Sequence, residues 1–549
     1  MYLNHRSIWS VFTKITISPF SLILLSSLFI TATSNLSFIE HFSQEYIVQN
    51  NVAFLVALMT IIWALNTVII AIVYSLLPLR WALAVILLVS VTCAYFADNF
   101  GVVIDVEMIR NSLQTNAAEA SDLLTLNLVM RLLLLGVVPI VLINSVTINA
   151  AKNPAAWLRK VKTVAGLLAV SVLVIALSMG VFSAQFSSFI RQHKELRYYI
   201  NPIQAIYSAG KYLGGQFKTS GKQTYSTLSN NSQIPLSDIH RELVIMVVGE
   251  TVRADHWGLN GYKRNTTPLL SQEENVINYP NISSCGTSTA ISVPCMFSFS
   301  GRDDFDVDTS AKTENAFDVL AKAKGGLSVL WRDNNSDSKG VAIRQQFEDF
   351  RTSQNNTLCD DECRDVGMLV GLQEYIDQQA KDIFIVLHQM GSHGPAYFKR
   401  YPKAFEIYRP ACQTAELSQC SDEEIINAYD NTIVYTDYFL SQVIALLKNN
   451  TEQFETSMIY VSDHGESMGE NGIYLHGLPY SFAPDSQTKV PLVVWTDVNS
   501  DIDIAATRQL AEQENSHDAI AKTLITLFEL ETDVKFNEAN NLLKFKQRP

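Results

Sequence analysis

Charged residues are distributed very unevenly along this chain, and this distribution limits the folds that it can adopt. Residues 1–190 contain only 16 Asp, Glu, Lys and Arg side chains, whereas the remaining 359 residues contain 79. The charged fraction of the later residues is ordinary for a soluble domain, but that of residues 1–190 is far below the usual value of about a quarter. The chain therefore combines a lipid-embedded part with a water-soluble part. This excludes a single soluble domain, a purely membrane-embedded transporter and a disordered chain.

Hydrophobic segments in the first third of the chain predict membrane-spanning helices. Five such segments cover roughly residues 19–38, 53–77, 82–97, 124–147 and 163–184. Most of them are close to the ~20 residues that cross a hydrocarbon core of ~30 Å, and the third is short. We expect an α-helical membrane domain over residues 1–185. An interfacial helix and a bridging linker follow over residues 186–240, and a soluble domain covers residues 241–549.

The charges of the connecting loops predict the orientation of these helices. Basic residues lie in the N-terminal segment, after the second span and between the fourth and fifth spans, and these are Arg6, Lys14, Arg80, Lys152, Arg159, Lys160 and Lys162. The other loops are mainly acidic. Because basic loops stay on the cytoplasmic side, the N-terminus is expected in the cytoplasm and the soluble domain on the exported side.

The net charge of the exported part restricts its ligands. The whole chain carries a formal net charge of −13, and residues 1–190 carry +2, so a charge of −15 belongs to the rest. A domain with this charge lacks the basic surface that nucleic acid requires. An anionic substrate would have to be attracted by a local site and not by the field of the whole domain.

Apolar runs alternate with helical stretches in the soluble part. The runs are LVIMVVG (243–249), LSVLW (327–331), IFIVLH (383–388), SMIYVSD (457–463) and VPLVVW (490–495). Helical stretches separate them, for example at residues 365–380 and 422–448. This alternation predicts an α/β/α sandwich, in which helices cover both faces of a mostly parallel sheet. In such folds, functional side chains gather at the carboxyl ends of the strands.

The cysteines indicate disulfide bonds in the exported part. Cys93 lies in the third span and is expected to be a core residue. The other six form neighbouring pairs, Cys285/Cys295, Cys359/Cys363 and Cys412/Cys420. An even number of cysteines in an oxidising compartment favours three local disulfides. Metal binding by the second pair is the alternative, but no His or Cys nearby in the sequence completes a set of four ligands.

Potential metal ligands follow several of the predicted strands. Glu250 follows the first run, His393 follows the third, and Asp463 and His464 end the fourth, with His476 shortly after. Carboxylates and imidazoles that converge at strand ends suit a zinc ion. A single His is more often structural, and a single strand-end Asp is often a helix cap, so only their combination predicts a metal site.

A Ser/Thr-rich turn between Cys285 and Cys295 offers candidate nucleophiles. Its sequence, CGTSTAISVPC, leads into an expected helix, whose free N–H groups bind phosphate oxygens. The same composition is also typical of an ordinary capped helix start. A hydroxyl becomes a good nucleophile only when a base or a metal lowers its pKa. These considerations do not choose among Thr287, Ser288, Thr289 and Ser292.

Six longer motifs together resemble one enzyme family. They are VVGET (247–251), SCGTSTAISVPCMF (284–297), WRDNNSDSKG (331–340), HQMGSHGPAYFKRY (388–401), NAYDNTI (427–433) and YVSDHGESMGENGIYLHG (460–477). This set closely resembles the phosphoethanolamine–lipid A transferases, which include the mobile colistin-resistance enzymes. The resemblance implies five transmembrane helices in a bacterial inner membrane. It also implies a periplasmic catalytic domain of the alkaline phosphatase/sulfatase superfamily.

The resemblance also implies roles for individual residues. Thr289 would be the nucleophile, and its oxygen would hold the principal zinc together with Glu250, Asp463 and His464. A further group would position the phosphoethanolamine, and some of its members would hold a second zinc during turnover, namely Asn335, Lys339, His393, Glu466 and His476. His388 would support the end of its strand or contribute to this group.

The reaction that the resemblance implies is a two-step transfer between lipids. Phosphoethanolamine would move from phosphatidylethanolamine to a phosphate of lipid A through a covalent intermediate on Thr289. Lys339 would offset negative charge on the phosphoryl oxygens, and His393 or His476 would move protons. The added ethanolamine cation would lower the negative charge of the cell surface and confer resistance to polymyxins such as colistin. The protein is expected to act as a monomer among membrane lipids.

Other functions remain open from the sequence. Lipoteichoic acid synthases share the architecture but transfer phosphoglycerol, and another glycan phosphate could be the acceptor. A sulfatase is less compatible, because the formylglycine motif Cys-x-Pro-x-Arg is absent from the sequence. A non-catalytic membrane sensor or scaffold is a different class, which would bind no zinc at Glu250 and Asp463 and would not be labelled at Thr289.

Overall fold

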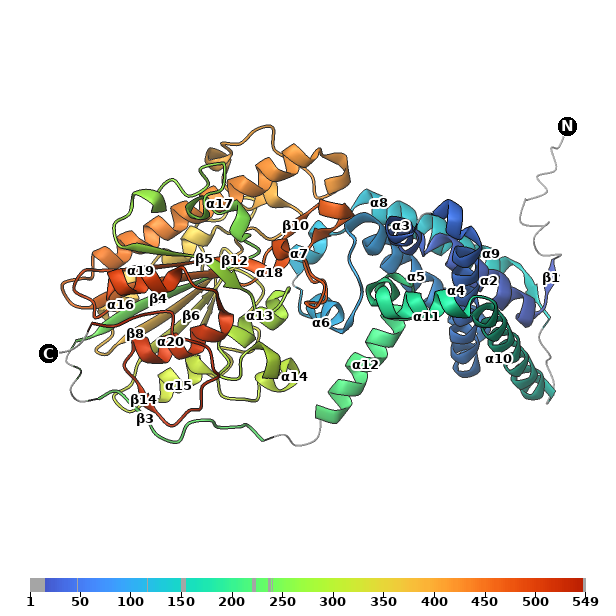
Figure 1. The fold of residues 1–549 in the computed structure, drawn as a ribbon, viewed down its shortest axis with the longest axis horizontal. Coiled ribbons are helices and arrows are strands. Elements are labelled where there is room, and N and C mark those ends of the chain that lie inside the picture. Colours follow the sequence, from blue (N-terminus) through green and yellow to red (C-terminus); the bar gives the residue numbers. More distant parts are fainter. Residues whose placement is uncertain are drawn as a thin grey trace. The chain divides into compact units, whose positions relative to one another are not determined.

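The computed structural model describes residues 15–46, 48–115, 117–149, 155–219, 224–235, 238 and 240–546 (Figure 1). Arg6, Lys14 and Lys152, which contribute to the predicted orientation, lie outside the described residues. The chain folds into two compact units, one made of Met1–Val106 and Leu124–Lys211 and the other of Glu107–Leu123 and Tyr212–Pro549. A short segment between two apolar helices, Glu107–Leu123, thus belongs to the unit that contains the soluble domain. No pattern in the sequence predicts this assignment.

The first unit is built from apolar helices. Its elements are β1 (Thr16–Ile17), α2 (Pro19–Thr33), α3 (Leu36–Glu45), α4 (Val48–Leu76), α5 (Leu79–Phe100), α8 (Leu126–Arg131), the π-helical turn η1 (Leu132–Val137), α9 (Val138–Ser145), β2 (Thr147–Ile148), α10 (Ala155–Val181), α11 (Ser183–Gln192) and η2 (Lys194–Tyr199). Helix α12 (Ile203–Thr219) starts in this unit and ends in the other.

Four helices among the described residues are long and apolar enough to cross a membrane, namely Asn51–Leu76, Leu79–Phe100, Leu126–Ser145 and Ala156–Val181. A fifth span exists if α2 and α3, which are bent by 49° at their junction, are counted as one. These helices confirm the predicted α-helical membrane domain. The prediction that the third span is short was wrong, because the helix contains 22 residues. Asp98 and Asn99 interrupt the apolar run, but the helix continues through them to Phe100.

The segment predicted to contain an interfacial helix includes α12, which begins at Ile203. This helix exposes large apolar side chains, of which Tyr207 is 65% exposed and Phe217 is 80% exposed. An apolar face of this kind is typical of an interfacial helix. The location of α12 on a membrane surface stays a prediction.

The second unit contains an eight-stranded sheet in the order β13-β5-β12-β9-β4-β8-β6-β7. The strands are β4 (Glu242–Gly249), β5 (Val276–Ser283), β6 (Ser328–Asp333), β7 (Gln346–Asp349), β8 (Ile383–His388), β9 (Glu455–Ser462), β12 (Lys489–Thr496) and β13 (Asn515–Ser516). Strand β12 runs antiparallel to both of its neighbours, and the other pairings are parallel. The five predicted strands and the mostly parallel sheet are therefore confirmed.

Helices cover both faces of this sheet (Figure 1). The side chains of β4 alternate, so that Val244, Met246 and Val248 face one core and the intervening residues face the other. Helices α13 (Thr289–Met296), α15 (Ala316–Lys322) and α20 (Ile520–Leu527) contribute to the first core, and α16 (Leu372–Asp377) and α17 (Asp422–Lys448) contribute to the second. The predicted α/β/α sandwich is confirmed, including the long helix at residues 422–448.

One helical prediction differs in its details. The stretch 365–380 is not one helix, because a 3-10 turn (Asp365–Leu369) is separated from α16 by Val370 and Gly371. Gly371 directly precedes α16 and has φ +70°, a left-handed conformation that favours glycine and interrupts a continuous helix.

Candidate active site

The carboxyl ends of four neighbouring parallel strands form one edge of the sheet. Strands β9, β4, β8 and β6 lie side by side, and Asp463, Glu250, His388 and Asp333 stand at or directly after their ends. All four side chains are fully buried, with relative exposures of 0%. Burial of charged and polar groups costs desolvation free energy, which partners or ligands must offset. This edge is therefore the candidate active site.

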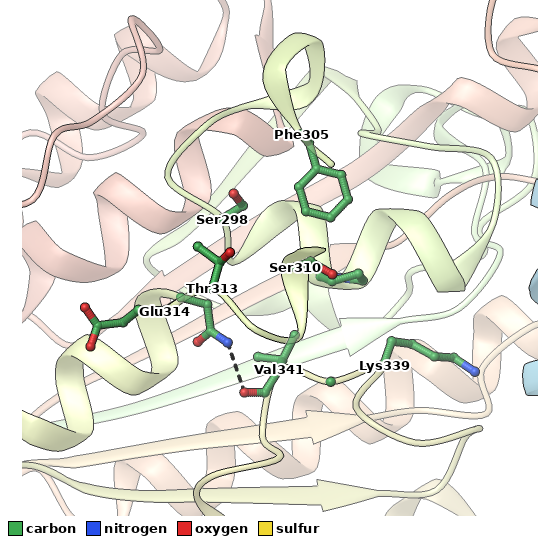
Figure 2. Close-up of a pocket in the computed structure, with 10 residues that line it drawn as sticks. Ser298, Phe305, Ser310, Thr313, Glu314, Lys339 and Val341 are labelled. Atoms are coloured by element: carbon green, nitrogen blue, oxygen red, sulfur yellow. Dashed lines mark hydrogen bonds between the residues drawn. The ribbon is translucent and has the colours of Figure 1, made fainter. Parts of the chain in front are cut away.

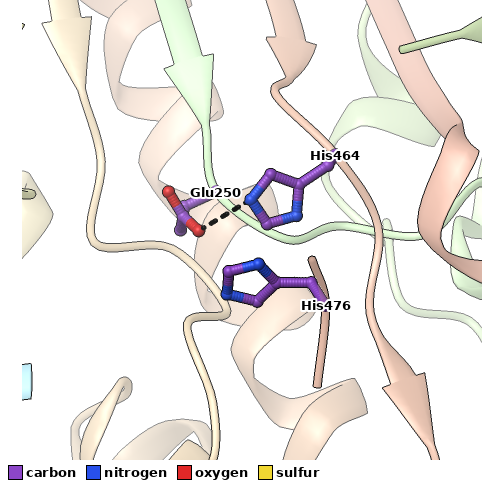
Figure 3. A group of neighbouring side chains, drawn as sticks. All are labelled: Glu250, His464 and His476. Atoms are coloured by element: carbon purple, nitrogen blue, oxygen red, sulfur yellow. Dashed lines mark ion pairs between the residues drawn. The ribbon is translucent and has the colours of Figure 1, made fainter. Parts of the chain in front are cut away.

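Glu250, His464 and His476 form a group that could hold a metal ion (Figure 3). One ligand atom from each lies within 4.8 Å of the others. His464 Nε2 is 3.6 Å from Glu250 Oε1 and 3.2 Å from Asp463 Oδ2. The structure thus brings together the three protein side chains expected around the principal zinc, Glu250, Asp463 and His464. It adds His476, which the resemblance assigns to the substrate.

The protonation states of these side chains are compatible with the binding of a cation. Burial lowers the pKa of His464 to about 3, so its imidazole is neutral. The Nδ1 of His464 lies 2.9 Å from the Gly465 carbonyl oxygen, to which only an N–H can donate. The lone pair is therefore on Nε2, which faces Glu250 and Asp463. A backbone acceptor that orients an imidazole in this way is common beside metal sites.

Asp463 supplies an unsatisfied oxygen to the same place. Its Oδ1 accepts hydrogen bonds from the backbone N–H of Thr251 at 3.2 Å and of His464 at 2.8 Å. Its Oδ2 is buried and has no hydrogen-bond partner among the described residues. Burial raises the pKa of Asp463, because the charged carboxylate is poorly solvated there. A bound cation would satisfy this oxygen and offset that cost, so the donor set fits a divalent metal.

The hydroxyl of Thr289 lies against this group. Thr289 is the first residue of α13, and its Oγ1 is 3.2 Å from Glu250 Oε2 and 3.4 Å from His464 Nε2. Two of the other candidate hydroxyls hold the turn in place: Thr287 Oγ1 donates to Leu478 O at 2.6 Å, and Ser292 Oγ donates to Gly286 O at 3.0 Å. The Ser288 hydroxyl is buried without a hydrogen-bond partner among the described residues.

Asn335 connects the end of β6 to the same group. Its Nδ2 donates to Glu250 Oε2 and to Gln389 O, both at 2.7 Å. Asp333 shapes this loop by accepting from the Asn335 N–H at 3.0 Å and by pairing with His388 Nδ1 at 2.8 Å. Burial disfavours the Asp333 charge, but His388 beside it lowers the pKa of this carboxyl below its ordinary value. His388 therefore supports the strand ends through Asp333.

Lys339 lies further along the Asn335 loop. Its Nζ donates to Ser336 O at 2.9 Å and to Gln114 O at 3.4 Å. Its backbone has φ +51°, and Lys339 also lines a small pocket beside α13 (Figure 2). In Figure 2 its ammonium end points away from the other labelled residues of that pocket. The structure thus holds the Lys339 charge near segment Glu107–Leu123 through Gln114.

His393 and Glu466 are both uncharged near neutral pH. The rings of His393 and His476 have centroids 5.8 Å apart. Burial, together with Arg400, lowers the pKa of His393 to about 4. Glu466 Oε1 accepts a hydrogen bond from Tyr397 Oη at 3.1 Å, and burial raises the pKa of Glu466 well above its ordinary value. The site therefore contains a neutral imidazole, that of His393, and a neutral carboxylic acid, that of Glu466, in addition to the candidate metal ligands.

The three expected disulfides are present, Cys285–Cys295, Cys359–Cys363 and Cys412–Cys420. The first joins the turn before α13 to the end of that helix and so fixes the position of Thr289. Cys93 is a buried free thiol, as predicted. Cysteines in disulfides do not bind metal, so the alternative of a metal site at Cys359 and Cys363 was wrong.

Comparison with known proteins identifies the family. Residues 62–217 match the family described as phosphoethanolamine transferase EptA/EptB, and residues 242–530 match the sulfatase family. The chain is 42% identical to phosphatidylethanolamine transferase Mcr-1 of Escherichia coli over 543 residues, which are 97% of this chain and 98% of that protein. The chain belongs to the phosphoethanolamine transferase family.

Two further relatives of this phosphoethanolamine transferase confirm the resemblance over the whole chain. Phosphoethanolamine transferase EptA of Escherichia coli K12 is 34% identical, covering 96% of each chain. The solved integral membrane lipooligosaccharide phosphoethanolamine transferase A (EptA) of Neisseria meningitidis superimposes with a TM-score of 0.88 at 32% identity. The match covers 95% of this chain and 98% of that one. The predicted combination of a membrane domain with a sulfatase-type domain is thereby confirmed.

Two residues that support the site of this phosphoethanolamine transferase were missed from the sequence. Asp365 accepts from Asn334 Nδ2 at 2.8 Å and from the N–H groups of Met390 and Gly391 at 2.9 and 3.1 Å, so it holds the loop that leads to His393. His517 Nδ1 accepts from the Cys285 N–H at 3.1 Å, and its Nε2 donates to Ser462 O at 3.0 Å. A solitary His or Asp far from the motifs carries no sequence signal of such a role.

His517 makes the stability of the soluble unit depend on pH. Burial lowers the pKa of His517 to about 4, well below its ordinary value of 6.5. The unfolded chain therefore takes up a proton below about pH 6.5 that the folded chain refuses until about pH 4, so folding stability falls as the pH falls through this window. One proton corresponds to a slope of about 1.4 kcal/mol per pH unit.

We expect His517→Gln to remove that part of the slope between pH 4 and 6.5. Urea unfolding of the zinc-loaded protein at several pH values measures it, and His240→Gln serves as the control because His240 is exposed. An unchanged slope in the His517 variant would show that another group causes the acid sensitivity.

Proposed function

We propose that this protein transfers phosphoethanolamine from phosphatidylethanolamine to a phosphate of lipid A, at the periplasmic face of a bacterial inner membrane. The observation that carries this proposal is the position of the Thr289 hydroxyl, 3.2 Å from Glu250 and 3.4 Å from His464 in a buried group of metal-ligand type. Relatives named for phosphatidylethanolamine and for lipooligosaccharide support the donor and the acceptor. The apolar helices would hold the reaction beside the two lipids.

The metal in this proposal is zinc. Glu250, Asp463 and His464 would hold it, and the Thr289 oxygen would complete the set, as the family pattern implies. His476 lies close enough to Glu250 and His464 to share this ion or to hold a second one together with His393. When bound, zinc lowers the pKa of a coordinated hydroxyl and polarises the phosphoryl group.

The chain's own residues would carry the two displacement steps. Thr289 Oγ1 forms a bond to the phosphorus of phosphatidylethanolamine while the bond to the diacylglycerol oxygen breaks, and that oxygen leaves with a proton as diacylglycerol. An oxygen of a lipid A phosphate then forms a bond to the same phosphorus, and the bond to Thr289 breaks. His393, whose imidazole is neutral near neutral pH, would relay the proton from Thr289 Oγ1 to the leaving oxygen. Asn335 keeps the Glu250 carboxylate in place, and Lys339 would offset charge on the phosphoryl oxygens.

The consequence for the cell follows from charge. An ethanolamine cation on a lipid phosphate reduces the negative charge at the membrane surface, so cationic peptides such as polymyxins bind less well. The soluble part carries an excess of negative charge although the proposed substrates are anionic. Attraction must therefore come from the zinc site and from the Lys339 loop.

Donor choice tests the proposal against its alternatives. We expect the full-length protein in detergent micelles with lipid A to release diacylglycerol from phosphatidylethanolamine but not from phosphatidylglycerol. The Thr289→Ala variant in the same assay controls for contaminating lipases. Preferential use of phosphatidylglycerol would favour phosphoglycerol transfer, and the absence of release from both lipids would favour a non-catalytic sensor or scaffold.

A further inference from the structure

A second group of carboxylates lies at the opposite edge of the sheet. Glu242 is the first residue of β4, and Asp382 directly precedes the neighbouring parallel strand β8, so both stand at the amino ends of their strands. Asp238 precedes Glu242 by a few residues. Because β4 contains 8 residues, roughly 25 Å separates this group from Glu250 at the other end. The group is therefore distinct from the candidate active site.

The three carboxylates converge tightly. One oxygen from each of Asp238, Glu242 and Asp382 lies within 4.8 Å of the others. Glu242 is only 6% exposed and Asp382 only 7%. The Glu242 N–H donates to Asp382 Oδ1 at 3.2 Å, so this oxygen of Asp382 has a hydrogen-bond partner. Glu242 Oε2, in contrast, is buried and has no hydrogen-bond partner among the described residues. A buried, unsatisfied carboxylate oxygen is costly unless a ligand satisfies it.

Nearby basic side chains make their hydrogen bonds and ion pair with other residues, although Arg241 also attracts the Asp382 carboxylate. The Arg241 guanidinium donates to Gln379 O at 2.8 Å and to Lys381 O at 2.9 Å, and it stacks over the Phe454 ring. His240 pairs with Glu455 at 3.2 Å. Burial, with Asp382 and Asp238 close by, raises the pKa of Glu242 to about 10. Without a ligand Glu242 therefore keeps its proton, and a bound cation would have to displace it.

We propose that Asp238, Glu242 and Asp382 bind a hard divalent cation, calcium, at the amino-terminal edge of the sheet. Three carboxylates offer only oxygen ligands, which suit calcium, whereas zinc prefers nitrogen and sulfur. Asp238 is partly exposed, which gives the ion a route of entry and leaves room for water ligands. The cation would satisfy Glu242 Oε2 and fix the starts of the two central strands β4 and β8.

Direct calcium binding tests this proposal on the full-length, zinc-loaded protein in detergent. Equilibrium dialysis with radioactive calcium should find about one ion per chain, and Glu242→Gln should reduce the bound calcium at least tenfold at the same free concentration. Two variants should bind as the natural chain does: Glu512→Gln, an exposed glutamate on the same unit, and Asp463→Asn, which lacks a proposed zinc ligand. Loss of binding in the Asp463 variant alone would place the calcium in the zinc site and overturn the proposal, whatever the outcome for transfer.

Thermal unfolding provides a second readout. Without calcium, Glu242→Gln should unfold at about the same temperature as the natural chain, because the pKa of Glu242 is raised to about 10 and glutamine resembles its neutral carboxyl. Saturating calcium should raise the midpoint of the natural chain by at least about 2 °C and leave that of the variant unchanged. If the Glu242 variant does not fold, Asp382→Asn replaces it. No calcium uptake by the natural chain, or equal uptake by both chains, would show that the group holds a shared proton and not a cation.

Discussion

Replacing Thr289 with alanine should abolish transfer and leave the fold unchanged. The substitution removes Oγ1, the atom next to Glu250 and His464, and alanine is well tolerated at the start of a helix. Loss of a covalent nucleophile typically costs at least about a thousandfold in turnover. Release of diacylglycerol from phosphatidylethanolamine measures the loss, and the unfolding midpoint shows whether the fold is kept. Cells that carry this variant should remain as sensitive to polymyxin as cells without the protein.

The neighbouring Ser288 provides the matched control. Its hydroxyl is buried in the same turn but makes no hydrogen bond among the described residues. We expect Ser288→Ala to retain activity within a few-fold of the natural chain. A normal rate for the Thr289 variant, or the loss of activity in the Ser288 variant alone, would show that the nucleophile is assigned to the wrong hydroxyl.

Replacing Glu250 with glutamine should remove both the metal and the activity. The Glu250 carboxylate contacts Thr289 Oγ1 and His464 Nε2, and it accepts from Asn335 Nδ2 at 2.7 Å. An amide keeps the size but loses the negative charge that holds a cation. We expect zinc content, measured by mass spectrometry of the purified protein, to fall to a small fraction of that of the natural chain. Transfer should fall at least about a hundredfold.

Glu466 is a suitable control for this loss because it is a second fully buried glutamate of the same unit. Burial raises its pKa well above the ordinary value, so its carboxyl is already neutral and glutamine imitates it closely. We expect Glu466→Gln to keep its zinc and to lose much less activity than Glu250→Gln. Full zinc content in the Glu250 variant would contradict the proposed metal site.

The central strands could be predicted because buried parallel strands carry uninterrupted apolar runs. Strand β4, for example, buries every residue from Glu242 to Gly249. Strand β5 was missed because its sequence, VINYPNIS, contains a proline and two asparagines and resembles a loop. Pairing with β12 on one side and β13 on the other makes it a strand. Tertiary contacts of this kind override local composition and leave no pattern in the sequence.

The metal group could be predicted, but the arrangement around it could not. Glu250, Asp463 and His464 directly follow or end apolar runs, so their convergence follows from the topology of a parallel sheet. The four hydroxyls of the Cys285 turn differ only in their partners, such as Leu478 for Thr287, and these partners are distant in sequence. The placement of segment Glu107–Leu123 could not be predicted either, because this segment lies between two apolar helices but folds with the soluble unit.

The central claim is the transfer of phosphoethanolamine to lipid A through Thr289, and mass spectrometry of lipid A tests it most directly. Lipid A would be compared from cells without the protein, with the natural chain and with Thr289→Ala. We predict that only the natural chain adds the mass of one phosphoethanolamine group. An unshifted lipid A with the natural chain, a shift by a phosphoglycerol group, or an equal shift with the alanine variant would contradict it.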